Sequence, residues 1–114
     1  MNIRVFGITN CDSVKKTRKW LDQAGKSYEF IDFRKSAPTE EEIASWVSRL
    51  SIDKVLNKRG TTWRKLSDAE KSQTDTAKLI KLMVQQPTLI KRPIIETGSE
   101  LLIGFDEAQL KAQC

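Results

Sequence analysis

Cys11 is the residue of this sequence with the clearest capacity for chemistry. It follows a short apolar run at residues 3–8 and precedes a segment with helical spacing, so it stands where a strand passes into a helix. The N–H groups and the dipole of a helix N-terminus favour an anion, and Lys15, one turn further on, adds a positive charge. Because the thiolate is the nucleophilic form of cysteine, this position predicts a reactive thiol. The alternative is a small buried apolar residue.

The chain offers Cys11 no neighbouring thiol. The residue three positions later is Val14, so the segment lacks the C-x-x-C pair that forms a disulfide across a first helical turn. Cys114 is the only other cysteine, and we expect it to belong to a flexible tail. An external thiol such as glutathione is therefore the natural partner for resolving an oxidised Cys11.

Composition excludes several other chemistries. The 114 residues contain no histidine, which removes the Ser-His-Asp triad, the Cys-His dyad and histidine-ligated metals. Two cysteines are too few for a thiolate zinc site or a disulfide framework. We expect no metal and no bound cofactor.

The first third of the sequence predicts a strand, a helix and a parallel strand. Val14, Thr17, Leu21 and Ala24 share one side of the helix, and Gly25 is a plausible stop. Residues 28–33 alternate aromatic and polar side chains over part of their length, as in a strand. A connection this short implies a right-handed crossover between parallel strands.

The remainder predicts a helical segment followed by two strands and a helix. Residues 34–91 contain two possible capping boxes, Thr39 with Glu42 and Ser67 with Glu70. Gly98-Ser99 is a hairpin signal between residues 94–97 and 100–103, and Asp106 can cap a last helix. The order β-α-β, helical insert, β-β-α predicts an α/β fold, a thioredoxin-like sheet with an inserted helical lobe.

Basic residues are unevenly distributed. The chain carries a formal charge of +5, and residues 34–91 alone hold twelve basic and seven acidic side chains. This pattern indicates either a solvated basic surface or attraction of a small anion or an acidic protein patch.

Two arginines are candidates for binding an anion. Arg59 lies in a polar, glycine-containing loop, and Arg92 precedes Pro93, across a peptide bond that can be cis. Guanidinium groups suit oxyanions, although a surface salt bridge is the alternative for each arginine.

Compartment and partners follow from the same composition. Residues 1–6 lack the pattern of a secretory signal, and no apolar stretch approaches the ~20 residues that span a bilayer. We expect a cytoplasmic monomer that does not associate with membranes. A charge of +5 is modest, and no aromatic platform or recognition-helix motif is present, so we expect no nucleic-acid binding.

Four blocks stand in order along the chain. They are Asn10-Cys11-Asp12-Ser13-Val14-Lys15-Lys16, Leu56-Asn57-Lys58-Arg59-Gly60-Thr61-Thr62-Trp63-Arg64-Lys65-Leu66, Leu89-Ile90-Lys91-Arg92-Pro93 and Gly104-Phe105-Asp106-Glu107. Together they resemble the YffB branch of the bacterial arsenate reductase-like (ArsC/Spx) family. Each block alone is a weak signal, whereas four in order are specific.

The resemblance implies one thioredoxin-like domain over residues 1–114, with a helical insert at about 34–91. It implies that Cys11 is the nucleophile of a glutathione-dependent thiol reductase, with glutathione or a glutaredoxin as partner. In the glutaredoxin-coupled arsenate reductases, one arginine in the helical lobe and another before a cis-proline hold the oxyanion, and these positions match Arg59 and Arg92. The predicted binding residues are Arg59, Arg92, Asn10, Lys15 and Pro93.

Two departures from the family pattern reduce the range of expected substrates. Those arsenate reductases carry a third arginine where this chain has Gly104-Phe105, and a histidine where it has Gly7. Since removal of one oxyanion donor can cost ~10²–10³ in rate, we expect that arsenate is not the main substrate. The related Spx regulators bind the RNA polymerase α subunit and sense redox state through C-x-x-C, which Val14 removes here. A redox-insensitive, Spx-like partner of polymerase is therefore the alternative function.

Overall fold

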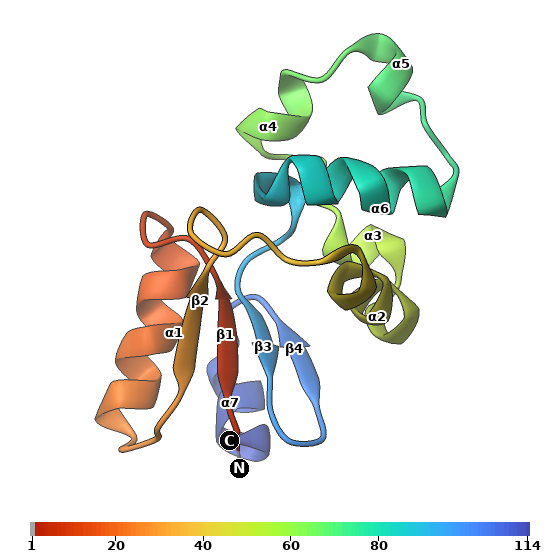
Figure 1. The fold of residues 1–114 in the computed structure, drawn as a ribbon. Helices are drawn as coiled ribbons and strands as arrows, with labels where there is room; N and C mark the ends of the chain where they lie inside the picture. Colours follow the sequence, from red (N-terminus) through yellow and green to blue (C-terminus); the bar gives the residue numbers. More distant parts are fainter. Residues whose placement is uncertain (1) are drawn as a thin grey trace. The chain divides into compact units, whose positions relative to one another are not determined.

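The computed structural model describes residues 2–114 and contains a four-stranded mixed sheet (Figure 1). The strands are β1 (Arg4–Gly7), β2 (Glu29–Asp32), β3 (Ile94–Glu96) and β4 (Leu101–Ile103), and their order across the sheet is β2-β1-β3-β4. β1 and β2 are parallel and joined by α1 (Asp12–Gln23), whereas β1–β3 and β3–β4 are antiparallel. Helix α7 (Glu107–Gln113) follows β4. The predicted β-α-β and β-β-α elements of a thioredoxin-like fold are confirmed.

The chain divides into two compact units. Unit 1 comprises Met1–Ser36 and Arg92–Cys114, and therefore holds the sheet with α1 and α7. Unit 2 comprises Ala37–Lys91 and is helical. None of the helices within residues 2–114 is long and apolar enough to cross a membrane.

One buried cluster of unit 1 lies on one face of the sheet. Because strand residues alternate between faces, the paired residues of neighbouring strands form a continuous row on that face. The row across the four strands is Phe30, Val5, Ile95 and Leu102. Leu21 of α1 and Leu110 of α7 belong to the same buried cluster, so both helices cover this face.

Local signals account for the ends of these elements. Gly25 has a φ of +70°, a conformation that glycine adopts without the strain of a Cβ, and it follows α1 as the sequence predicts. The Thr97 N–H donates to the Glu100 oxygen at 3.0 Å across the predicted Gly98-Ser99 turn. Asp106 caps α7 by accepting from the Gln109 N–H at 3.2 Å. Phe105, just before this cap, packs against the cluster that contains Leu110, in the arrangement of a hydrophobic staple.

Unit 2 consists of short helices around an apolar core. In chain order they are α2 (Glu40–Leu50), α3 (Ile52–Val55), α4 (Thr61–Arg64), α5 (Asp68–Lys71), α6 (Thr76–Gln85) and the 3-10 helix η1 (Pro87–Leu89). Ile43 and Trp46 of α2 are fully buried, as is Met83 of α6. At the start of α6, Ala77 is exposed, whereas Leu79 lies in the core. A ten-residue helix in a small unit buries only those of its apolar residues that contact another element.

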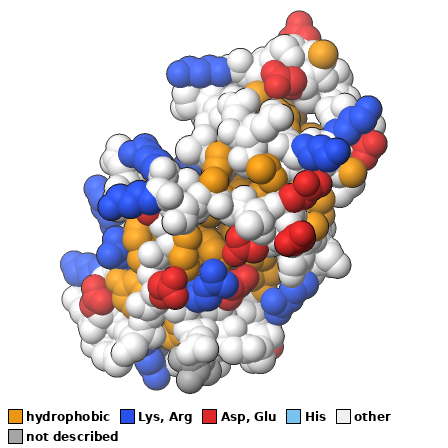
Figure 2. Space-filling model, viewed as in Figure 1, with side chains coloured by type: hydrophobic (Ala, Val, Ile, Leu, Met, Phe, Trp, Pro, Cys, Tyr) orange, Lys and Arg blue, Asp and Glu red, His pale blue; other side chains and the backbone are white. Residues whose placement is uncertain are grey.

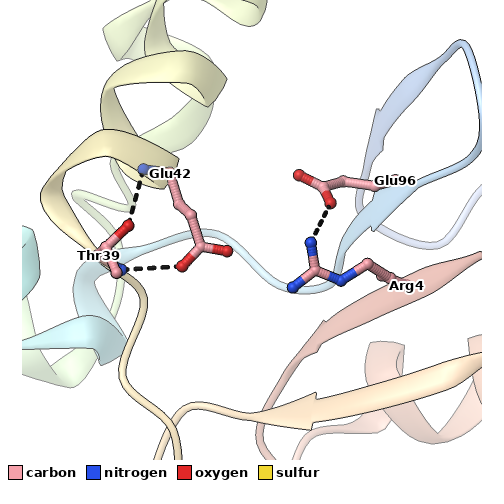
Figure 3. Close-up of polar contacts among 4 residues, drawn as sticks. All are labelled: Arg4, Thr39, Glu42 and Glu96. Carbon is pink, nitrogen blue, oxygen red and sulfur yellow. Dashed lines mark hydrogen bonds and ion pairs between the residues drawn. The ribbon is translucent and has the colours of Figure 1, made fainter.

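Both predicted capping boxes are confirmed. Thr39 accepts from the Glu42 N–H at 3.1 Å and its own N–H donates to Glu42 Oε1 at 3.0 Å, as Figure 3 shows. Ser67 and Glu70 make the same reciprocal pair before α5.

In unit 1, an ion pair joins β1 to β3 beside the buried row. The Arg4 guanidinium lies 3.1 Å from Glu96 Oε1, and Figure 3 shows the two side chains. Arg4 and Glu96 are themselves paired in the sheet register.

Gly7 lets α1 approach β1 closely. A Cβ added at Gly7 would lie 2.6 Å from the Val14 Cγ2 atom, closer than side-chain carbons approach in folded proteins. Val14 is fully buried and its branched side chain is short and stiff, so it has little freedom to move aside. The end of β1 and the first turn of α1 therefore depend on having no side chain at position 7.

We expect Gly7→Ala to destabilise the protein by about 1–3 kcal/mol, because the new methyl group overpacks the space filled by Val14. The Gly7→Ala/Val14→Ala double variant should lose less free energy of unfolding than the two single variants lose in sum, because Val14→Ala removes the methyl groups that oppose the new one. Urea denaturation measures these free energies. Gly98→Ala is the control, because no atom lies within 4 Å of a Cβ there. Strict additivity of the two core substitutions would contradict the close approach.

Candidate functional site around Cys11

Cys11 is the N-cap residue of α1. Its backbone is extended, with φ −148° and ψ 124°, and its carbonyl accepts the Lys15 N–H at 2.9 Å. The thiol makes no capping hydrogen bond and the residue is half-buried, so the sulfur is accessible at the helix end. The first N–H groups of a helix have no carbonyl partner within it, and together with the helix dipole they favour a negative charge at this position.

Asn10 and Lys15 accompany Cys11 at the same end of unit 1. Asn10 immediately precedes it in the loop after β1, and Lys15 lies one helical turn further along α1. Both residues are exposed. Among residues 2–114 no carboxylate forms an ion pair with Lys15, so its charge remains available to an anion near the helix end.

The sheet brings Arg92 and Pro93 to this end as well. The Arg92–Pro93 peptide bond is cis, as the sequence allowed, and Pro93 is buried while Arg92 is half-buried. β3 begins at Ile94, opposite Phe6 of the antiparallel β1. The residues just before β3 therefore lie at the carboxyl end of β1, where the loop to Cys11 begins.

Arg59 belongs to unit 2. It lies between α3 and α4 in the predicted loop, where its N–H donates to Asn57 Oδ1 at 3.0 Å. Arg59 lines a pocket of about 300 Å³ whose other charged residues are Asp53, Lys58 and Lys91. The sequence prediction did not include these three residues. A signal was present, because each lysine directly precedes one of the two predicted arginines in the chain.

Cys114 is not in a flexible tail, so that expectation is wrong. It is half-buried and packs against the cluster that contains Leu21 and Leu110. Burial raises the pKa of the Cys114 thiol, and the positive charge of Lys26 partly opposes this shift. Leu21 lies ten residues beyond Cys11 on α1, roughly 15 Å along the helix at 1.5 Å per residue. The two thiols are therefore associated with opposite ends of α1.

We expect the alkylation rate of Cys114 to rise with pH through a midpoint above the usual thiol value, because its neutral form is favoured by burial. Lys26→Gln should move that midpoint further upward, since it removes the charge that favours the thiolate. Iodoacetamide kinetics in a Cys11→Ser background isolate the signal of Cys114. Lys19→Gln, which changes an exposed charge in α1, is the control, and an equal upward shift there would contradict the assigned role of Lys26.

Comparison with known proteins identifies the family. The ArsC family model matches residues 6–113, and the chain therefore belongs to the ArsC family. A solved structure described as a YffB protein is 40% identical with a TM-score of 0.94 and covers 97% of both chains. A solution structure of an arsenate reductase (ArsC) related protein from Brucella melitensis is 38% identical with a TM-score of 0.76, over 98% of this chain and 93% of that one.

The curated relatives include proteins of two kinds. A protein of Haemophilus influenzae described as uncharacterized is 37% identical over 110 residues, which are 96% of each chain. The global transcriptional regulator Spx of Streptococcus agalactiae is 27% identical over 112 residues, covering 96% of this chain and 81% of the regulator. The resemblance to the YffB branch of the ArsC/Spx family is confirmed.

Proposed function

We propose that the protein is a glutathione-dependent thiol oxidoreductase with Cys11 as its nucleophile. The observation that carries this proposal is the accessible thiol at the N-cap of α1, which no capping hydrogen bond occupies. Membership of the ArsC family supports a thiol oxidoreductase. Reduced glutathione is maintained in the cytosol, and the proposed reaction therefore takes place there.

The reaction is a pair of thiol–disulfide exchanges. The Cys11 thiolate attacks a mixed disulfide of a substrate thiol with glutathione, forms a Cys11–glutathione disulfide and expels the substrate as a thiolate, which takes up a proton. The thiolate of a second glutathione, or of a glutaredoxin, then attacks the glutathione sulfur of that intermediate. Cys11 leaves as a thiolate and oxidised glutathione, or the glutaredoxin–glutathione disulfide, is released. The two electrons that reduce the substrate thus come from the second thiol and the glutathione first carried by the substrate.

Charged and polar groups of each unit have separate roles in this proposal. Lys15 and the N-terminus of α1 attract the negatively charged glutathione to the end of the helix that holds Cys11. Arg92 binds a carboxylate of glutathione, and Asn10 and Pro93 shape the end of the sheet at which the tripeptide meets Cys11. Arg59 binds a second carboxylate through its planar pair of N–H donors.

Two glycines favour a thiol substrate over arsenate. Gly104 belongs to the pair Gly104-Phe105, which stands where the arsenate reductases carry their third arginine. Its φ is +77°, a conformation that strains the backbone of any residue with a side chain. Gly7 stands where the arsenate reductases carry a histidine, and the contact with Val14 leaves no room for a side chain. The site therefore has fewer groups to hold and polarise a tetrahedral oxyanion.

We expect oxidised glutathione to form a single adduct with the protein, through a disulfide to Cys11. Intact-mass measurement should detect one glutathionyl group on the wild type, none on Cys11→Ser, and an undiminished adduct on the matched Cys114→Ser variant. The difference follows from the position of Cys11 at the helix N-terminus and from the raised pKa of the Cys114 thiol, which favours its less reactive neutral form. An adduct that persists in Cys11→Ser and disappears in Cys114→Ser would sink the proposal.

A second candidate function is a Spx-like interaction with the RNA polymerase α subunit, independent of redox state. The observation in its favour is the similarity to Spx over 96% of this chain. If this function applies, a pull-down with the polymerase α C-terminal domain should retain the protein, and Cys11→Ser should be retained equally. Absence of binding by both proteins removes this candidate.

A further inference from the structure

The pocket beside Arg59 is built entirely within unit 2. Its charged residues come from two chain segments, of which residues 53–59 hold three and Lys91 is the fourth. A short antiparallel contact joins the segments: Leu56 and Ile90 form a β-bridge, the Asn57 N–H donates to the Leu89 oxygen at 2.7 Å, and the Lys91 N–H donates to the Val55 oxygen at 2.8 Å. These bonds fix Lys91 beside Lys58 and Arg59.

Charges of opposite sign line this pocket without neutralising one another. Asp53 supplies a carboxylate and Lys58, Arg59 and Lys91 supply three cations, yet in the described part of the chain none of the four forms an ion pair. The Lys91 ammonium instead donates to the backbone oxygen of Asp53 at 3.2 Å, and the Lys58 ammonium lies 5.4 Å from the centre of the Trp63 ring. The Asp53 carboxylate therefore remains available to a cation, and the basic groups to an anion.

We propose that this pocket binds a zwitterionic α-amino-acid group, the kind found at the γ-glutamyl end of glutathione. The ligand's ammonium pairs with Asp53, and its carboxylate pairs with Lys58 and Arg59 while Lys91 adds to the positive field. A pocket of about 300 Å³ is at the small end of ligand sites and suits one end of a tripeptide. An inorganic dianion fits less well, because the Asp53 carboxylate repels it.

This inference deepens the proposed function, since it names the group by which the thiol co-substrate is recognised. On the face shown in Figure 2, basic and acidic side chains are interspersed over the surface. On that face, a ligand therefore meets local pairs of opposite charges rather than one broad basic field.

The first arm of the test examines Asp53 with S-methylglutathione, whose blocked sulfur cannot exchange with Cys11. Isothermal titration calorimetry on the whole protein should show that N-acetylation of this probe, which removes the ammonium, weakens binding about tenfold. Asp53→Asn should also weaken the binding of S-methylglutathione about tenfold. This variant should bind S-methylglutathione and its N-acetylated form with equal affinity. Asp68→Asn, an exposed carboxylate in the first turn of α5, is the control and should retain the discrimination.

The second arm examines the cations with a probe whose γ-glutamyl α-carboxylate is replaced by an amide. Lys58→Gln should weaken S-methylglutathione binding about tenfold and leave the affinity for the amide probe unchanged. Lys54→Gln removes an equal charge from α3 at a residue that does not line the pocket, and should bind both probes as the wild type does. Circular dichroism of each variant verifies that it is folded.

Three results would overturn the inference: no binding of S-methylglutathione by the wild type at millimolar concentration, full discrimination between the acetylated and free probes by Asp53→Asn, or equal weakening by Lys58→Gln and Lys54→Gln. The adduct measurement on Cys11 is independent of all three. If S-methylglutathione binds and the variants change its affinity as expected while Cys11 forms no adduct, the pocket assignment is upheld and the proposed function fails. If the adduct forms while the pocket variants bind normally, the proposed function stands and the pocket assignment fails.

Discussion

The close approach of α1 to β1 is the constraint on which the candidate site depends. A helix can begin immediately after a strand and return along the same sheet only if its first turn passes near the strand end. In this protein Gly7 provides the space and Val14 fills it, at a separation that admits no Cβ at position 7. The loop between them holds Cys11 at the N-cap of α1, so the packing of two apolar positions determines where the sulfur lies.

The same contact explains why the chain has one thiol at this site. Position 14, where a C-x-x-C protein has its second cysteine, is here a fully buried packing position against β1. Its branched side chain completes the core of unit 1 near the strand end, and chemistry at Cys11 must therefore use a thiol from outside this turn. The half-buried Cys114 is associated with the other end of α1, near Lys26, and its raised pKa disfavours the thiolate.

Charge is arranged differently in the two units. In unit 1 the groups that favour an anion are the helix end, Lys15 and Arg92, all near the carboxyl end of β1. In unit 2 a single pocket combines three cations with one carboxylate. The first arrangement favours an anion alone, whereas the second can also accept a cation at Asp53.

The sequence by itself determined the helices, the strands and the position of Cys11 at a helix start, because their signals are local. Helical spacing, the Thr39 and Ser67 caps and the Gly98-Ser99 turn each act within a few residues, and Cys11 could be placed at a helix start from its immediate neighbours. Only the tertiary structure decided which distant residues meet. The register of β3 on β1 brings Arg92 to the strand end near Cys11, and the Leu56–Ile90 bridge sets Lys91 beside Arg59. Cys114 was misjudged for the same reason, since it packs against a cluster whose members include Val5 and Leu21, more than ninety positions away, and no short-range pattern encodes such packing.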